Sequence, residues 1–174
     1  MNAKRPKIPL EKLEKSTFER VISFLSMLIF LGSLAFLALV WGDIPDRVPA
    51  HFNFSGEVTR HGSQWELLIL PIIGLVIYLS MHLLEKYPHM HNYPIEITES
   101  NAEEAYKISR SMLGMLKNTI LVIFSFIMIN ASVIALGWGD GVASLILPLV
   151  FLGTGLPIII AIVKLVKLSL RDGT

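Results

Sequence analysis

The residues best suited to chemistry gather between residues 45 and 65, in the stretch PDRVPAHFNFSGEVTRHGSQW. It supplies imidazoles at His51 and His61 and a carboxylate at Glu57, groups that zinc and other transition metals accept as ligands. Their spacing matches no established ligand pattern, so neither a metal nor another cofactor is predicted. His51 and Asn53 are instead expected to satisfy backbone groups of this loop. A metal bound by His51 and His61 is the alternative left open.

The sequence does not specify catalytic machinery. Hydrolysis needs a nucleophile beside a base, or a metal with a base, and neither arrangement can be read from the order of the residues. The chain has no cysteine, which excludes thiolate chemistry and disulfides. A second histidine pair, His89 and His91, is expected to belong to a loop. The chain is therefore predicted not to be an enzyme.

The polar stretch lies between two long apolar runs, and two more such runs follow. Only 17% of the residues are charged, against about a quarter in ordinary soluble domains. About 20 apolar residues suffice to cross the hydrocarbon core as a helix. The runs predict an all-α membrane protein, a four-transmembrane-helix bundle forming one domain over residues 21–168, with spans at about 21–41, 67–84, 112–138 and 142–168. The first span is expected to be retained as an anchor because no small-x-small cleavage site follows it.

The positive charges predict which side each loop faces. Of the 15 lysine and arginine residues, only Arg47 and Arg60 lie between the first two spans. Positive charge collects on the cytoplasmic side of membrane proteins. Both termini and residues 85–111 are therefore predicted to be cytoplasmic, and residues 42–66 to form an ordered extracytoplasmic loop. The basic segment 1–20 is expected to be a solvated or interfacial anchor, with residues 169–174 as a cytoplasmic tail.

Several lysines lie near the predicted inner ends of the helices, where their side chains are expected to snorkel toward the interface: Lys117, Lys164 and Lys167. The inner segment holds a helix-start signal as well. Ser100 followed by Glu103 fits a capping box. From Asn101 onward no proline occurs until Pro148, so the third helix is expected to begin in the cytoplasm and continue unbroken into the membrane.

Polar residues inside the spans predict helix contacts. A stripe of small or weakly polar residues recurs every seven positions, at Ser111, Asn118, Ser125 and Ser132. Such a face allows close helix packing; a ligand or ion path is the alternative. Asn130 lies off this stripe and is also expected to face protein. His82, near an inner helix end, is expected to bond to a neighbouring helix.

Pro157 interrupts the fourth predicted span. It cannot donate a backbone hydrogen bond to the carbonyl of Gly153, and this loss should kink the helix there. Gly153 and Pro157 are therefore the predicted hinge.

Two blocks of the sequence resemble a bacterial membrane domain of unknown function, found at the N-terminus of SdpI-type toxin-immunity proteins. The first block lies between the first two spans and matches at Pro45, Val48, Pro49, His51, Phe52, Asn53, Gly56 and Gly62. The second is similar to a block of short members of the family, at Asn92, Tyr93, Pro94, Thr98, Asn101 and Tyr106. The resemblance implies a multi-pass protein of the bacterial cytoplasmic membrane that senses or resists an external peptide.

The functional prediction is non-enzymatic recognition of, or protection against, an extracytoplasmic molecule such as a peptide or toxin. The expected binding residues in the outer loop are His51, Phe52, Asn53, Gly56, Glu57 and His61. A signal would pass to a cytoplasmic motif of Asn92, Tyr93, Pro94, Thr98 and Asn101. The alternatives are a small transporter or transporter subunit, with polar residues His82, Asn118, Ser125 and Asn130 in its path, and a metal-binding membrane enzyme. The expected partners are the lipid bilayer, the external molecule, and a second copy or another membrane protein; no nucleic acid is expected.

Overall fold

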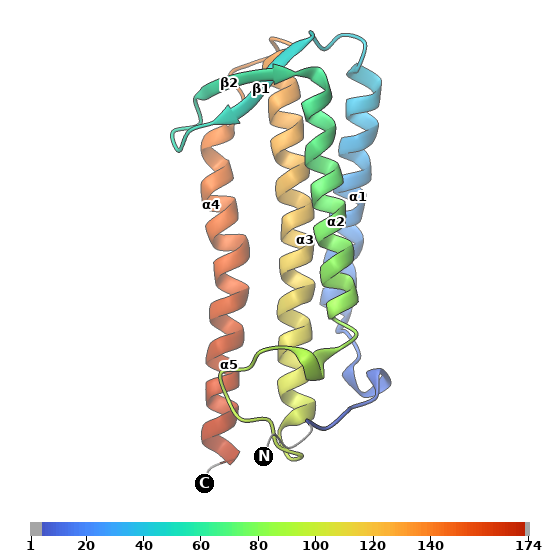
Figure 1. Ribbon diagram of the computed structural model, residues 1–174, viewed down its shortest axis with the longest axis vertical. Helices are drawn as coiled ribbons and strands as arrows, with labels where there is room; N and C mark the ends of the chain where they lie inside the picture. Colours follow the sequence, from blue (N-terminus) through green and yellow to red (C-terminus); the bar gives the residue numbers. More distant parts are fainter. Residues whose placement is uncertain (1–4, 173–174) are drawn as a thin grey trace.

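Four long helical columns lie side by side in the computed structural model, which describes residues 5–172 (Figure 1). The first three are α1 (Thr17–Val40), α2 (Ile69–Leu84) and α3 (Ala102–Ala135). The fourth consists of α4 (Ile146–Val150), a π-helical turn (Phe151–Gly155) and α5 (Leu156–Asp172). Each column is long and apolar enough to cross a membrane, the second when the 3-10 turn Gln64–Leu68 ahead of α2 is included. The mean hydropathy of their most apolar windows is 2.0 to 2.6. The structure thereby confirms four helices of the length and apolar composition that the sequence predicts for membrane spans.

The helix α3 lies at the centre of the assembly and packs against each of the other columns. Within its most apolar window 44% of the residues are buried, against 6% in the fourth column. Small residues allow the close approach. A side chain at Gly74 on α2 would press on Phe124, and one at Gly153 would collide with Thr119 on α3. The fourth column is thus a peripheral helix whose main helix contact is α3.

The start of α3 differs from the predicted capping box. Asn101 is the N-cap residue, and its side chain makes no capping bond to the helix. Its amide folds back onto the preceding loop, where Oδ1 accepts from the Thr98 backbone N–H at 3.0 Å. Ser100 bonds to Thr98, and Glu103 pairs with Lys107, so neither takes its predicted capping role. The helix does continue unbroken to Ala135, as predicted.

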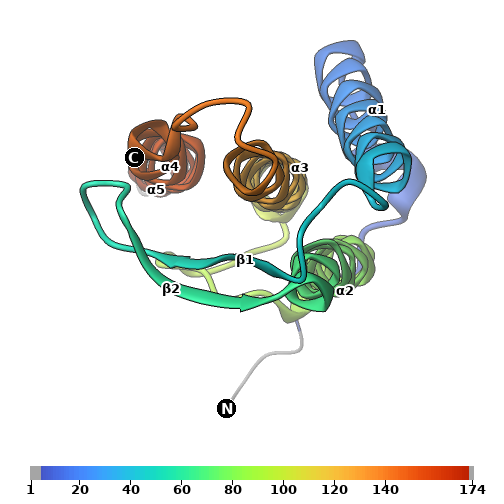
Figure 2. The same cartoon turned by 90° about the horizontal axis from the view of Figure 1, so that it is seen from above.

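The fourth column accommodates Pro157 without the predicted kink. The π-helical turn Phe151–Gly155 ends two residues before Pro157, and α4 and α5 remain stacked nearly end to end in both views (Figures 1 and 2). A π turn is one of the ways in which a helix absorbs a break in its hydrogen-bond ladder. The predicted hinge is therefore a locally widened helix that packs against α3.

The predicted all-α class is incomplete, because the structure also contains two strands. The segment between α1 and α2 forms an antiparallel hairpin of β1 (Arg47–Phe52) and β2 (Val58–Ser63). The strands lie across one end of the bundle, from α2 toward α4 (Figure 2). Strand β1 buries Val48 completely, in a cluster with Leu37, Leu67 and Met128. This contact attaches the hairpin to the helix ends.

The other end of the bundle is covered by the N-terminal segment, which packs against protein. Leu13, in the short 3-10 helix Leu10–Leu13, is only 2% exposed. The Tyr106 hydroxyl on α3 donates to the Pro6 carbonyl at 2.9 Å, and Arg5 donates to the His91 carbonyl at 2.5 Å. The expected solvated or interfacial anchor is therefore a docked strap across residues 85–101 and α3. The helix α1 then begins at a Ser16–Glu19 capping box.

Candidate functional site

The hairpin turn is built by its own side chains. The Asn53 Oδ1 accepts from the backbone N–H groups of Ser55 at 3.0 Å and Glu57 at 2.9 Å. The Asn53 amide also donates to Glu57 Oε2 at 2.7 Å. Gly56 has a φ of 84°, a conformation that residues with a side chain rarely adopt. Asn53, Gly56 and Glu57 thus fix the shape of the loop.

The two histidines of the hairpin do not converge with a third metal ligand. His51 Nδ1 lies 2.7 Å from Thr59 Oγ1, and His51 is paired across the strands with Arg60. His61 is exposed and stands opposite Pro49. Within residues 5–172 no group of three or more histidine or acidic side chains could hold a metal. Catalytic zinc normally takes three protein ligands, a set that the described residues do not assemble around these histidines.

A groove lies between the hairpin and the helix ends, and is here called the hairpin groove. Its volume is about 750 Å³, within the range of ligand pockets. Residues from β1 through the turn form its roof, and Leu67, Leu70 and Ile127 belong to its floor. Phe54, at the turn, is 87% exposed although it is aromatic. The groove therefore combines an apolar floor with a roof that carries polar side chains.

A surface ion pair marks the polar edge of the hairpin groove. Arg60 donates to both carboxylate oxygens of Glu66, at 3.2 and 2.7 Å. This hydrogen bonding raises the pKa of Arg60 above its ordinary value. A side chain at Gly62 would collide with the Glu66 carboxylate. Glu66 also accepts from the Ser63 backbone N–H and caps the helical turn leading into α2. Gly62 therefore leaves room for a pair that joins β2 to that turn.

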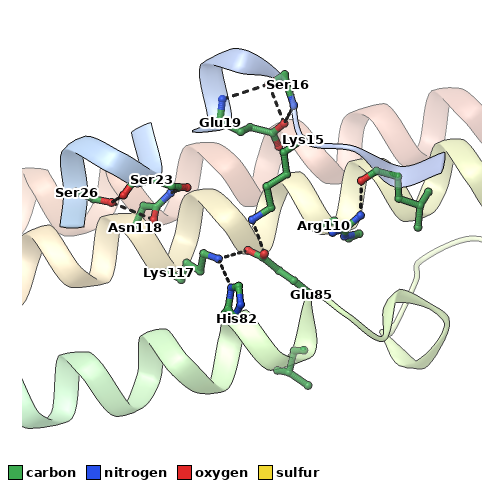
Figure 3. Close-up of polar contacts among 12 residues, drawn as sticks. Lys15, Ser16, Glu19, Ser23, Ser26, His82, Glu85, Arg110, Lys117 and Asn118 are labelled. Carbon is green, nitrogen blue, oxygen red and sulfur yellow. Dashed lines mark hydrogen bonds and ion pairs between the residues drawn. The ribbon is translucent and has the colours of Figure 1, made fainter. Parts of the chain in front are cut away.

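The polar residues inside the bundle form helix contacts. Asn118 accepts a hydrogen bond from Ser26 at 3.0 Å and donates to Ser23 at 2.9 Å, both on α1 (Figure 3). Ser125 is buried and donates to the carbonyl of Leu121 on its own helix. Asn130 Oδ1 accepts from the Val142 N–H at 2.6 Å and so binds the turn before α4. Asn118 therefore helps to pack α3 against α1, and Asn130 attaches α3 to the turn before α4.

A buried ionic cluster at the N-terminal strap was not foreseen from the sequence patterns. Glu85, 2% exposed, lies 2.5 Å from Lys15 and 2.9 Å from Lys117 (Figure 3). His82 Nδ1 lies 3.2 Å from Lys117 Nζ, which in turn stands 5.1 Å from the Tyr78 ring centroid. We call Lys15, Glu85 and Lys117 the inner clasp. It joins the N-terminal strap, the end of α2 and the side of α3.

The inner clasp corrects the prediction that Lys117 snorkels. Its side chain is 2% exposed and points at Glu85. Gly114 makes this possible, because a Cβ there would lie 3.2 Å from Glu85 Oε1. The available signal was a glutamate, Glu85, directly after the second predicted span and a lysine, Lys117, near the start of the third. Ionisable residues at membrane depth tend to pair with one another.

The second resemblance block is part of the strap's docking surface. The Tyr93 hydroxyl donates to the Pro88 carbonyl at 2.9 Å, and burial raises the pKa of Tyr93 to about 12. Thr98 and Asn101 are bonded to each other through the loop before α3. Asn92 and Pro94 are exposed. His91 bridges Ser109 and the Leu84 carbonyl, and burial lowers the pKa of His91. This block therefore supports the bundle end opposite the hairpin.

A comparison with known families covers the hairpin together with parts of α1 and α2. Residues 28–75 match a family described as a domain of unknown function, DUF1648. An uncharacterized protein of Archaeoglobus fulgidus is 39% identical over 64 residues, which cover 32% of this chain and 35% of the relative. The chain thus aligns with about a third of the length of this curated relative. No solved structure matches. The family match runs from the second half of α1 through the hairpin into α2, and the inner clasp lies outside it.

Proposed function

We propose that this chain is a non-enzymatic membrane protein that binds an extracytoplasmic amphipathic molecule, of the peptide or toxin class, in the hairpin groove. The observation that carries the proposal is the groove itself. It places an apolar floor of Leu67, Leu70 and Ile127 under polar strand residues that include His51 and Arg60. An apolar side chain of the ligand can be buried below while its polar groups meet the strand above.

The arrangement of charged and aromatic residues supports an outward-facing hairpin. Arg47 and Arg60 are the basic residues of the hairpin, whereas Lys15, Lys86 and Arg110 belong to the opposite end. All three tryptophans follow or precede helices at the hairpin end. Trp41 and Trp65 contact each other, with ring centroids 5.3 Å apart. Indole rings favour the membrane interface, and positive charge favours the cytoplasmic side.

The buried state of the mid-bundle polar residues favours binding over transport. A transport path near Ser125 and Asn130 requires contact with water, yet these residues are 2% and 3% exposed. Ser125 donates to its own helix and Asn130 Oδ1 accepts from the turn before α4, while the buried Asn130 amide nitrogen has no hydrogen-bond partner among the described residues. A cysteine placed at either position is expected to resist a water-soluble maleimide. Rapid labelling of both would favour the transport alternative.

Selection from a peptide library tests the proposal and supplies ligands for affinity measurements. The chain, reconstituted in nanodiscs, is used to select binders from a phage-displayed library of short amphipathic peptides. Ile69→Trp fills the groove from α2, and Ile72→Trp is the matched control, because Ile72 is exposed but does not line the groove. Selected peptides are expected to lose at least tenfold in affinity for Ile69→Trp and to bind Ile72→Trp normally. Equal binding to both variants would contradict the proposed site.

A further inference from the structure

A second groove lies on the other side of α3, between α1 and the fourth column. It has a volume of about 480 Å³ and is walled by Ile22 and Ile29 of α1, and by Leu152 and Ile160 of the fourth column. Its floor on α3 is more polar, with Asn118 and Thr119. Because α1 and the fourth column are both membrane-spanning candidates, this groove opens toward the hydrocarbon of the bilayer. We call it the leaflet groove.

The length of the leaflet groove corresponds to one half of a bilayer. Its lining on the fourth column runs from Leu149 to Ile160, about 16 Å at a rise of about 1.5 Å per residue. The hydrocarbon core is about 30 Å thick, so one leaflet contributes about 15 Å. On α1 the lining extends from Phe18 to Ile29, which places the groove in the half of the membrane nearest the N-terminal strap.

The lining of the groove suits a flexible hydrocarbon chain. Aliphatic side chains wall it on both sides over a length that matches one leaflet, and Lys164 stands beyond the end nearest the strap. An acyl chain with an anionic headgroup matches both features, whereas an apolar helix of a second copy would match only the first.

The end of the groove near the strap carries positive charge that no carboxylate neutralises. Gly153, Pro157, Ile160 and Lys164 follow each other at helical spacing along one face, so Lys164 stands one turn beyond the groove lining. Lys164 and Lys167 are exposed, and within residues 5–172 no ion pair is formed by either. The carboxylates at this end of the fourth column have partners of their own: Glu104 lies 3.7 Å from Arg171, and Asp172 accepts from Ser100 at 3.4 Å.

We propose that the leaflet groove binds an anionic phospholipid. One acyl chain lies along α3 between α1 and the fourth column, and the headgroup phosphate meets Lys164 and Lys167. Basic residues at the end of a cleft between transmembrane helices are a recognised basis for selecting anionic lipids. The bound lipid fills the space between α1 and the fourth column, and so holds that peripheral column in place.

Native mass spectrometry of the detergent-purified chain tests this proposal with phosphatidylglycerol and phosphatidylcholine as probes. Wild type is expected to retain phosphatidylglycerol at least fivefold more than phosphatidylcholine. Leu152→Trp and Ile29→Trp fill the groove from opposite walls and should each lower retention of both lipids at least fivefold. Phe151→Trp is the matched control: Phe151 is 68% exposed, outside the groove, and its replacement should leave retention unchanged.

The headgroup contact is tested separately by Lys164→Gln combined with Lys167→Gln. This variant should bind both lipids equally, because the acyl-chain site remains while the charge is removed. Unchanged lipid retention in both groove-filling variants, or an unchanged preference in the lysine variant, would overturn the proposal. A dimer that dissociates in Leu152→Trp but persists in Phe151→Trp would also overturn it, since a second copy would then be the occupant.

Discussion

At the scale of single residues, the polar and charged contacts at the two ends of the bundle differ in what they stabilise. At the hairpin end, Asn53 and Glu57 are occupied with each other and with the turn, while His51 has one ring nitrogen bonded to Thr59. At the strap end, Glu85 is enclosed by Lys15 and Lys117. The first group shapes a surface, and the second joins separate segments of the chain.

Removing Glu85 should be strongly destabilising. Glu85→Ala leaves Lys117 buried without its counter-ion, and breaking a buried pair in this way costs about 3–5 kcal/mol. The free energy of unfolding is measured by denaturant titration in detergent micelles. Glu103→Ala is the control, because its pair with Lys107 is nearly half exposed and should contribute less than about 1 kcal/mol. Similar losses in the two variants would show that the inner clasp is not a structural centre.

The turn residue Asn53 and the strand residue His51 should behave differently. Asn53→Ala removes three hydrogen bonds of the turn, each worth about 1 kcal/mol, so amide hydrogen exchange across residues 47–63 should accelerate. His51→Ala removes one side-chain contact, with Thr59, and should accelerate that exchange less than Asn53→Ala does. It should nevertheless lower the affinity for the selected peptides, because His51 lines the groove. Slow exchange and unchanged peptide affinity in both variants would contradict the assigned roles.

His91 predicts a pH dependence of stability. Burial lowers its pKa in the folded chain below the ordinary value of 6.5, so the unfolded chain takes up the proton first as the pH falls. Stability is therefore complete above about pH 6.5 and decreases as the pH falls toward the lowered pKa. The midpoint of thermal unfolding, followed between pH 8 and pH 5, should fall less in His91→Gln than in wild type. Parallel curves would assign the pH dependence to another group.

At the scale of elements, the sequence was sufficient for the helices because length and apolar composition determine what can cross a bilayer. It was insufficient where the hydrogen-bond or ion-pair partner of a side chain could not be identified from the local pattern. The Ser100–Glu103 pattern was a valid capping signal, yet Asn101 and Thr98 bond to each other instead. The snorkelling predicted for Lys117 was wrong, because its partner Glu85 lies at the end of another helix and the local sequence does not reveal that contact.

The contact between the fourth column and α3 gives a further prediction at this scale. Gly153 faces the Thr119 methyl group without room for a side chain, so Gly153→Val should lower the free energy of unfolding by about 1–3 kcal/mol. Thr119→Ala removes that methyl group and should restore part of the loss in the double variant. Additive losses in the double variant would mean that the two residues do not oppose each other.

At the scale of the whole molecule, α3 is a central support that separates two grooves. The hairpin groove is open at one end of the bundle, and the leaflet groove opens sideways near the other. The charge imbalance predicted an orientation, and the hairpin's composition indicated where to look for a binding surface. Neither groove could be foreseen, because each is lined by residues of three columns whose spacing depends on packing.

Site-directed labelling in intact cells tests the central claim that the hairpin groove faces the exterior. The chain has no cysteine, so single cysteines can be placed at the exposed Ser55 in the hairpin turn and at the exposed Ser100 at the other end. A membrane-impermeant maleimide should label Ser55→Cys in intact cells and Ser100→Cys only after permeabilisation. The reverse pattern would place the hairpin in the cytoplasm and contradict binding of an external molecule.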